Sequence, residues 1–128
     1  MDLISELAAD QGLTAKTTES LRVLHDKTSV LPFEMKIQKQ GVFYRDFLRW
    51  TRDGKTWFDA VPAQKWVLFY FNKRALHVQG LDYRSIQACL PHAIERRDLV
   101  VKVRLHDKKE ASVVAKLINA AARNGTLV

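Results

Sequence analysis

Residues 42–60 have the sequence VFYRDFLRWTRDGKTWFDA, and this stretch decides the fold because more than one secondary structure is compatible with it. In a hairpin, Asp53-Gly54 forms a two-residue type I′ turn, whose central residues both need positive φ. The turn places Trp50 opposite Trp57, and such a cross-strand aromatic pair stabilises a sheet by about 0.2–1 kcal/mol. We favour this hairpin because Asp-Gly is among the strongest sequence signals for a two-residue turn.

A basic amphipathic helix is the main alternative for the same residues. Phe43, Phe47 and Trp50 would then form one stripe of the helix, and the three arginines of the stretch another. A third arrangement joins a helix over 42–50 to a turn at Asp53-Gly54. All three arrangements stay open at the level of sequence.

The segments before this stretch predict two helices and a strand. Leu3, Ile4 and Leu7 repeat with helical spacing behind Asp2, a residue type that caps helices. The periodicity of the apolar residues predicts helices over 2–9 and from 14 or 15 to 25, ended by Gly12 and Pro32, and an alternating strand over 33–38.

The segments after it predict a mixture of strands and helices. Pro91 must kink or break any helix that contains it, because proline lacks the backbone donor and crowds the preceding turn. The last helix is expected to bury Val114, Leu117, Ile118 and Ala121. The pattern predicts strands over 66–71, 75–79 and 99–105, a helix over 82–96, and a final helix over 108–124.

Together these elements predict an α+β fold. It consists of two N-terminal helices, a mainly antiparallel sheet of about four to six strands, and a C-terminal helix-strand-helix unit. The length of 128 residues suits a single domain, since domains have about 100–200 residues. We assign residues 1–31 to a helical segment, 33–79 to a strand-rich basic region and 82–125 to the helix-strand-helix unit.

Composition excludes several classes of protein. Cys89 is the only cysteine, so a disulfide scaffold is excluded, and hydrophobic content of 47% is ordinary for a globular protein. The longest apolar run, residues 67–71, is far shorter than the 18 or more residues of a membrane span. The acidic N-terminus lacks the features of a signal peptide. We therefore expect a cytoplasmic protein with no membrane partner.

The net charge of +7 is unevenly distributed along the chain. Residues 1–32 contain three Lys or Arg against five Asp or Glu, whereas residues 33–74 contain nine against four and residues 75–128 nine against five. A basic folded surface attracts polyanions, of which nucleic acid is the first candidate. The charge therefore indicates a partner that contacts the second and third of these regions.

The acidic N-terminal region contains a partial helix-turn-helix pattern. Leu7, Gly12 and Leu21 have the spacing of that motif, but Gln11 and Thr18 stand at positions that are usually apolar. A DNA-reading helix must also neutralise phosphates, but this region has more Asp and Glu than Lys and Arg. We therefore interpret these helices as structural.

The stretch from Phe43 to Trp57 is the better candidate for nucleic-acid binding because it interleaves cations with aromatic rings. The cations would contact phosphate, and the tryptophans would support the surface or stack on bases. Two further basic clusters can widen this surface. The full candidate set is Arg45, Arg49, Arg52, Lys55, Trp50, Trp57, Lys73, Arg74, Lys102, Arg104, Lys108 and Lys109.

Catalytic signatures are weak, and the sequence therefore favours a non-enzymatic protein. Cys89 and His92 form the one Cys/His proximity, which is too few ligands for zinc, so no metal and no cofactor are expected. One alternative function is a regulatory or inhibitory protein that docks an acidic partner protein. A second is a small metal-independent ribonuclease or toxin that uses Arg74, His77, Tyr83 and Arg84. The choice between DNA and RNA and the oligomeric state are left open.

Overall fold

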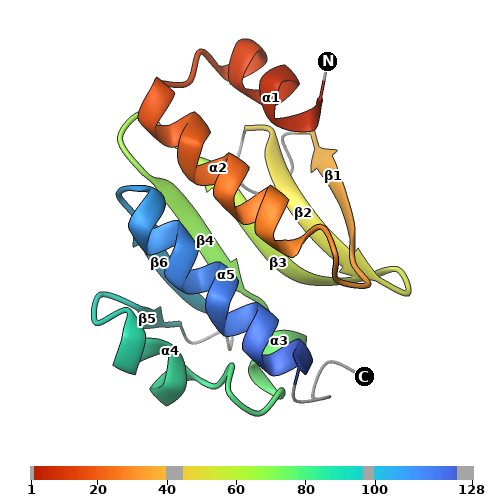
Figure 1. The fold of residues 1–128 in the computed structure, drawn as a ribbon, viewed down its shortest axis with the longest axis vertical. Coiled ribbons are helices and arrows are strands. Elements are labelled where there is room, and N and C mark those ends of the chain that lie inside the picture. Colours follow the sequence, from red (N-terminus) through yellow and green to blue (C-terminus); the bar gives the residue numbers. More distant parts are fainter. Residues whose placement is uncertain (1, 40–44, 97–99, 124–128) are drawn as a thin grey trace.

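The fold is α+β and consists of one antiparallel sheet with helices packed against it (Figure 1). The computed structural model describes residues 2–39, 45–96 and 100–123. The helices within these ranges are α1 (Leu3–Gln11), α2 (Ala15–Thr28), α3 (Lys73–Leu76), α4 (Tyr83–Cys89) and α5 (Lys108–Arg123). The strands are β1 (Glu34–Gln38), β2 (Phe47–Arg52), β3 (Lys55–Pro62), β4 (Val67–Phe71), β5 (Ile94–Glu95) and β6 (Val101–Leu105), in the sheet order β1-β2-β3-β4-β6-β5.

The hairpin at Asp53-Gly54 is confirmed, and the helical alternatives are wrong from Phe47 onwards; residues 42–44 lie outside the described part of the chain. Asp53 and Gly54 both have positive φ, at 53° and 73°, as a type I′ turn requires.

The predicted pairing of Trp50 with Trp57 is wrong. The register shifts after the turn, so that Trp50 lies opposite Phe58 and Trp57 is the extra residue of a β-bulge. The bulge lets Trp50 and Phe58 both pack in the core with centroids 6.4 Å apart, while Trp57 packs edge-on against Phe33 at 5.5 Å. Packing of three large rings therefore determines the register, and the turn alone does not.

Replacing Gly54 with alanine is expected to lower the free energy of unfolding by about 1–2 kcal/mol, because a Cβ is unfavourable in the left-handed region. Urea denaturation measures this loss. The matched control is Asp53→Asn, which changes a turn residue to one that tolerates the same φ and should leave the midpoint nearly unchanged. Equal effects of the two substitutions would contradict the assigned turn.

The sheet has one face covered by helices and a second face with its own small cluster. Figure 1 shows α2 and α5 side by side along the first face, and their buried residues join those of the strands in one core. On the second face Phe47, Val61 and Tyr70 form a separate buried cluster, supported by Leu68 and Val100. None of the described members of this cluster comes from a helix. α2 thus contributes mainly to the core, which supports a structural role for the N-terminal helix pair.

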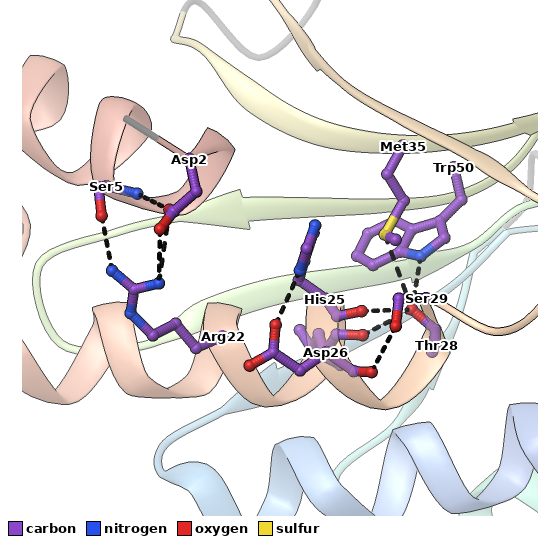
Figure 2. A network of polar contacts seen from close by, with 10 residues as sticks. Asp2, Ser5, Arg22, His25, Asp26, Thr28, Ser29, Met35 and Trp50 are labelled. Atoms are coloured by element: carbon purple, nitrogen blue, oxygen red, sulfur yellow. Dashed lines mark hydrogen bonds and ion pairs between the residues drawn. The ribbon is translucent and has the colours of Figure 1, made fainter.

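Trp50 connects the sheet to α2 and is fully buried, with 0% of its surface exposed. Its indole Nε1 donates to the hydroxyl of Thr28 at 3.0 Å, and that hydroxyl donates to the carbonyl of Leu24 at 2.6 Å. Figure 2 shows the indole directed at the end of α2, with the sulfur of Met35 close to the same hydroxyl. The ring therefore has all its polar capacity satisfied inside the protein.

α1 is attached to α2 by a polar contact at its first turn, also visible in Figure 2. The Arg22 guanidinium donates to the hydroxyl of Ser5 at 2.7 Å and forms an ion pair with Asp2 at 3.4 Å. Asp2 caps α1 by accepting from the backbone N–H of Ser5, and this hydrogen bond is the main cause of a lowered pKa of Asp2. The cap and the ion pair both stabilise the carboxylate form.

Two predictions in the C-terminal half are wrong. The strand over 75–79 is replaced by α3 and a turn, because Ala75, Val78 and Leu81 are buried at helical three-residue spacing. The helix over 82–96 ends at Cys89, and residues 94–95 form β5 instead. Leu90, the residue before Pro91, has ψ of 83°, as expected because proline disfavours helical conformation in the residue before it.

The other elements agree with the sequence within the described residues. α5 buries Val114, Ile118 and Ala121 as expected, whereas Leu117 is half-buried at the edge of the core. Leu99 and Asn124, the predicted ends of a strand and a helix, lie outside the described part.

Candidate nucleic-acid interface

A hollow lies at the end of the sheet where β3 begins and β4 ends. The backbone N–H of Asn72 donates to the carbonyl of Trp57 at 3.0 Å, which places the start of α3 beside β3. The hollow has a volume of about 970 Å³. Its lining includes Lys55 from the hairpin and, after β4, Asn72, Lys73, Arg74 and His77.

A second, smaller hollow of about 170 Å³ adjoins the first, since Lys55, Trp57 and Arg74 line both. It adds Arg52 and Asp53 from the hairpin. We call the two together the hairpin–α3 hollow. It brings cations from two segments about twenty residues apart in the sequence onto one surface.

The hairpin–α3 hollow is strongly basic. Lys55, Lys73, Arg74 and His77 are exposed. Among the described lining residues the one carboxylate is that of Asp53, in the smaller part. Cations that converge on a hollow with low-dielectric walls raise the local concentration of anions.

The two candidate tryptophans differ in their relation to this surface, because Trp57 lines the hollow and Trp50 does not. Trp57 is only 9% exposed and contacts Phe33 and Phe58 edge-on or at a tilt, so it forms part of the floor of the hollow. Trp50 lies in the core on the helix-covered face. Trp57 can therefore support the surface of the hollow, and stacking on a base is excluded for Trp50, which is fully buried.

A polar row crosses the second face of the sheet. Strand pairing places Lys36, Arg49, Asp59, Tyr70 and Lys102 directly opposite one another in that order. Directly opposed residues point to the same side of a sheet. The row therefore brings Arg49 and Lys102, from two predicted clusters, to one face.

Arg49 is held by the carboxylate of Asp59, which is only 3% exposed. Its Nε donates to Oδ1 at 2.8 Å and its Nη2 to Oδ2 at 3.3 Å, and its guanidinium lies 5.0 Å from the ring centroid of Phe47. The amide of Asn72 donates to the same carboxylate at 3.3 Å. Asp59 thus offsets much of the charge of Arg49 and connects the row to the hairpin–α3 hollow.

The remaining predicted residues lie apart from the hollow. Arg104 is on the second face, with its guanidinium 4.6 Å from the ring centroid of Trp66. Arg45 donates to the carbonyl of Pro62 at 2.7 Å, at the far end of β3. Lys108 and Lys109 are exposed in the first turn of α5, beyond the end of β6 that is remote from the hollow. The twelve candidates therefore fall into several groups and do not form one patch.

The residues proposed for a ribonuclease are also divided. Arg74 and His77 both line the hairpin–α3 hollow. Tyr83 and Arg84 belong to α4, and the hydroxyl of Tyr83 donates to the carbonyl of Ala93 at 3.4 Å. Two of the four residues thus share a site.

Sequence reasoning missed a separate hollow of about 470 Å³, which lies beside the β3–β4 turn and apart from the hairpin–α3 hollow. Lys16, Lys65, Trp66 and His106 are among its lining residues. The sequence predicts Trp66 in a buried strand, but β4 begins one residue later and Trp66 is half-buried. The alternation along 101–105 extends to His106 and is the sequence signal that could have placed it beside Trp66.

The described ranges contain neither a candidate metal site nor a membrane-spanning helix. Residues 2–39, 45–96 and 100–123 contain no group of three or more His, Cys, Asp or Glu side chains placed to hold a metal ion. No helix in these ranges has the length and apolar character needed to cross a membrane. Comparisons with protein-family models, with curated protein sequences and with solved structures give no match.

Proposed function

We propose that this protein binds nucleic acid, with the hairpin–α3 hollow as its phosphate-binding surface. The observation that carries the proposal is the convergence of Lys55, Lys73 and Arg74 around one hollow, with Arg52 in its adjoining part. Cations gathered in this way neutralise successive phosphates and release the counterions condensed on the polymer, which is the main source of sequence-independent affinity.

The surrounding contacts favour a preformed surface. Asn72 is tied to β3 through its backbone and to Asp59 through its amide, so the start of α3 is fixed next to the hairpin. The exposed cations are then presented by anchored backbone, which reduces the ordering cost of binding. Phosphate contacts of this kind position a nucleic acid without specifying its sequence. We therefore expect weak sequence preference.

The test measures the affinity of labelled single-stranded and duplex oligonucleotides by fluorescence anisotropy over a range of salt concentrations. The double variant Lys73→Ala/Arg74→Ala is expected to bind at least about tenfold more weakly at low salt. It should also reduce the slope of log K against log salt by about 1 for each phosphate contact that is lost.

The matched control is Lys116→Ala/Arg123→Ala, which removes the same charge from exposed positions on α5 that do not line the hollow. Its effect should be much smaller. Failure of the natural protein to bind any polynucleotide at low salt would overturn the proposal. Capture of one acidic protein from nuclease-treated host extract, lost in Lys73→Ala/Arg74→Ala, would instead identify an acidic protein as the partner of this surface.

A further inference from the structure

We propose that Trp66 is a stacking platform for an unpaired nucleobase. Trp66 directly precedes β4, and the hairpin–α3 hollow lies at the other end of this strand. This inference rests on the proposed function and adds to it that the bound nucleic acid is single-stranded at this point. The evidence is the partial exposure of the ring, the contacts that fix it, and the cations around it.

Trp66 differs from the other two tryptophans in its exposure. Trp50 is 0% and Trp57 is 9% exposed, whereas Trp66 is half-buried and lines the hollow of about 470 Å³. The exposed part of an indole is apolar surface in contact with water, and a base has the flat, polarisable surface that an indole stacks on. The Arg104 guanidinium lies over one face of the ring, 4.6 Å from its centroid, so the proposal concerns stacking of a base on the opposite face.

Neighbouring side chains hold the indole in place. The Arg104 guanidinium lies 4.6 Å from its centroid, and the His106 ring meets it edge-on at 6.2 Å. His106 is fixed in turn by Glu110, which accepts from its backbone N–H at 2.7 Å and lies 3.0 Å from its Nδ1. A ring fixed before binding loses little entropy when a base stacks on it.

The turn that carries Trp66 is also anchored. The hydroxyl of Thr17 lies 3.2 Å from both the Ala63 and the Gln64 carbonyl oxygens and can share its proton between them. The hydroxyl of Thr14 donates to the carbonyl of Gln64 at 3.1 Å. The beginning of α2 thereby closes one side of the hollow. These contacts place Lys16 of α2 at the hollow that the indole lines.

The charges around the ring suit a phosphate chain. Lys16 and Lys65 are exposed and line the hollow, and Arg104 is exposed on the adjoining strand. The described residues that line the hollow include no carboxylate. Cations beside an aromatic face are the combination that binds single strands, since phosphates contact the charges and bases contact the ring.

One strand of nucleic acid is long enough to contact both the hollow at Trp66 and the hairpin–α3 hollow. Trp66 and Asn72 flank β4 and are six residues apart in extended chain, which corresponds to about 20 Å. Arg104 and Lys102 lie opposite Leu68 and Tyr70 on the same stretch of the second face. A single strand of about four or more nucleotides, within the range of known site sizes, would contact both ends.

The first test measures the fluorescence of the natural protein as base-bearing oligothymidine is added. Trp57 lines the hairpin–α3 hollow, so the titration is repeated on Trp66→Phe, and the part of the fluorescence change that is lost in this variant reports on Trp66. Oligothymidine is expected to quench the emission, whereas an abasic strand of the same length and inorganic polyphosphate should bind without quenching. Equal quenching by the abasic strand would overturn the proposal. Quenching by thymidine monophosphate at the same concentration as by the oligomer would identify a free nucleotide as the ligand and overturn the polynucleotide assignment.

The second test compares variants at low salt. Trp66→Ala is expected to weaken binding of oligothymidine by about 5- to 150-fold and to leave binding of the abasic strand unchanged. Trp66→Phe keeps an aromatic face and should retain most of the affinity. If the natural protein binds oligothymidine in a manner that depends on Lys73 and Arg74 but shows neither quenching nor an effect of Trp66→Ala, the platform fails and the proposed function stands. If no strand binds at all, both fail.

Discussion

Replacing Trp50 with alanine is expected to lower the free energy of unfolding by about 3–5 kcal/mol, since removal of a buried tryptophan leaves a large cavity. The ring is fully buried between two sheet neighbours, Phe58 and Phe69, with centroids 6.4 and 5.7 Å away. The substitution also removes the hydrogen bond to Thr28 that joins the sheet to α2. Urea denaturation followed by circular dichroism measures the loss.

Two milder variants separate packing from hydrogen bonding. Trp50→Phe keeps most of the packing, and Thr28→Val leaves the indole N–H buried without an acceptor, which costs about 1–3 kcal/mol. The double variant Trp50→Phe/Thr28→Val should lose less free energy of unfolding than the sum of the two single losses. Phenylalanine has no N–H, so in the double variant valine leaves no buried donor without an acceptor. A loss below about 1 kcal/mol for Trp50→Ala would contradict the placement of this ring in the core.

Replacing Asp59 with alanine is expected to be the second most destabilising change, at about 2–3 kcal/mol. The carboxylate is 3% exposed, accepts two hydrogen bonds from Arg49 and one from Asn72, and leaves both donors unpaired when it is removed. Breaking a fully buried ion pair costs about 3–5 kcal/mol. The loss expected here is at or below the lower end of that range, because the Arg49 side chain is 25% exposed and regains some hydration when its partner is removed.

A double-mutant cycle with Arg49→Ala isolates the interaction between the two side chains. The double variant is expected to be more stable than the sum of the single effects predicts, by about 0.5–3 kcal/mol. Lys36→Ala is the matched control, since Lys36 is an exposed cation in the same row and should change stability by no more than about 0.5 kcal/mol. Additive effects of the two substitutions at 49 and 59 would contradict the paired geometry.

Elements governed by local chemistry were predictable from the sequence. The Asp53-Gly54 turn depends on the φ values of two residues, and the strand over 101–105 depends on an alternation that the sequence displays directly. The α+β class and the order of most elements followed from the same short-range signals. Errors occurred where long-range packing prevailed, as in the bulge at Trp57 and in the burial that makes α3 a helix.

The sequence by itself determined that the protein is basic, where along the chain its charge lies, and that three tryptophans are available. Only the tertiary structure decided what these residues can contact. A backbone hydrogen bond between Asn72 and Trp57 brings the cations of α3 beside those of the hairpin, and no local pattern encodes that pairing. The tryptophans differ for the same reason, since exposure depends on which neighbours cover a ring. Packing buries Trp50 and Trp57 and leaves Trp66 partly exposed, in contact with Arg104 and His106.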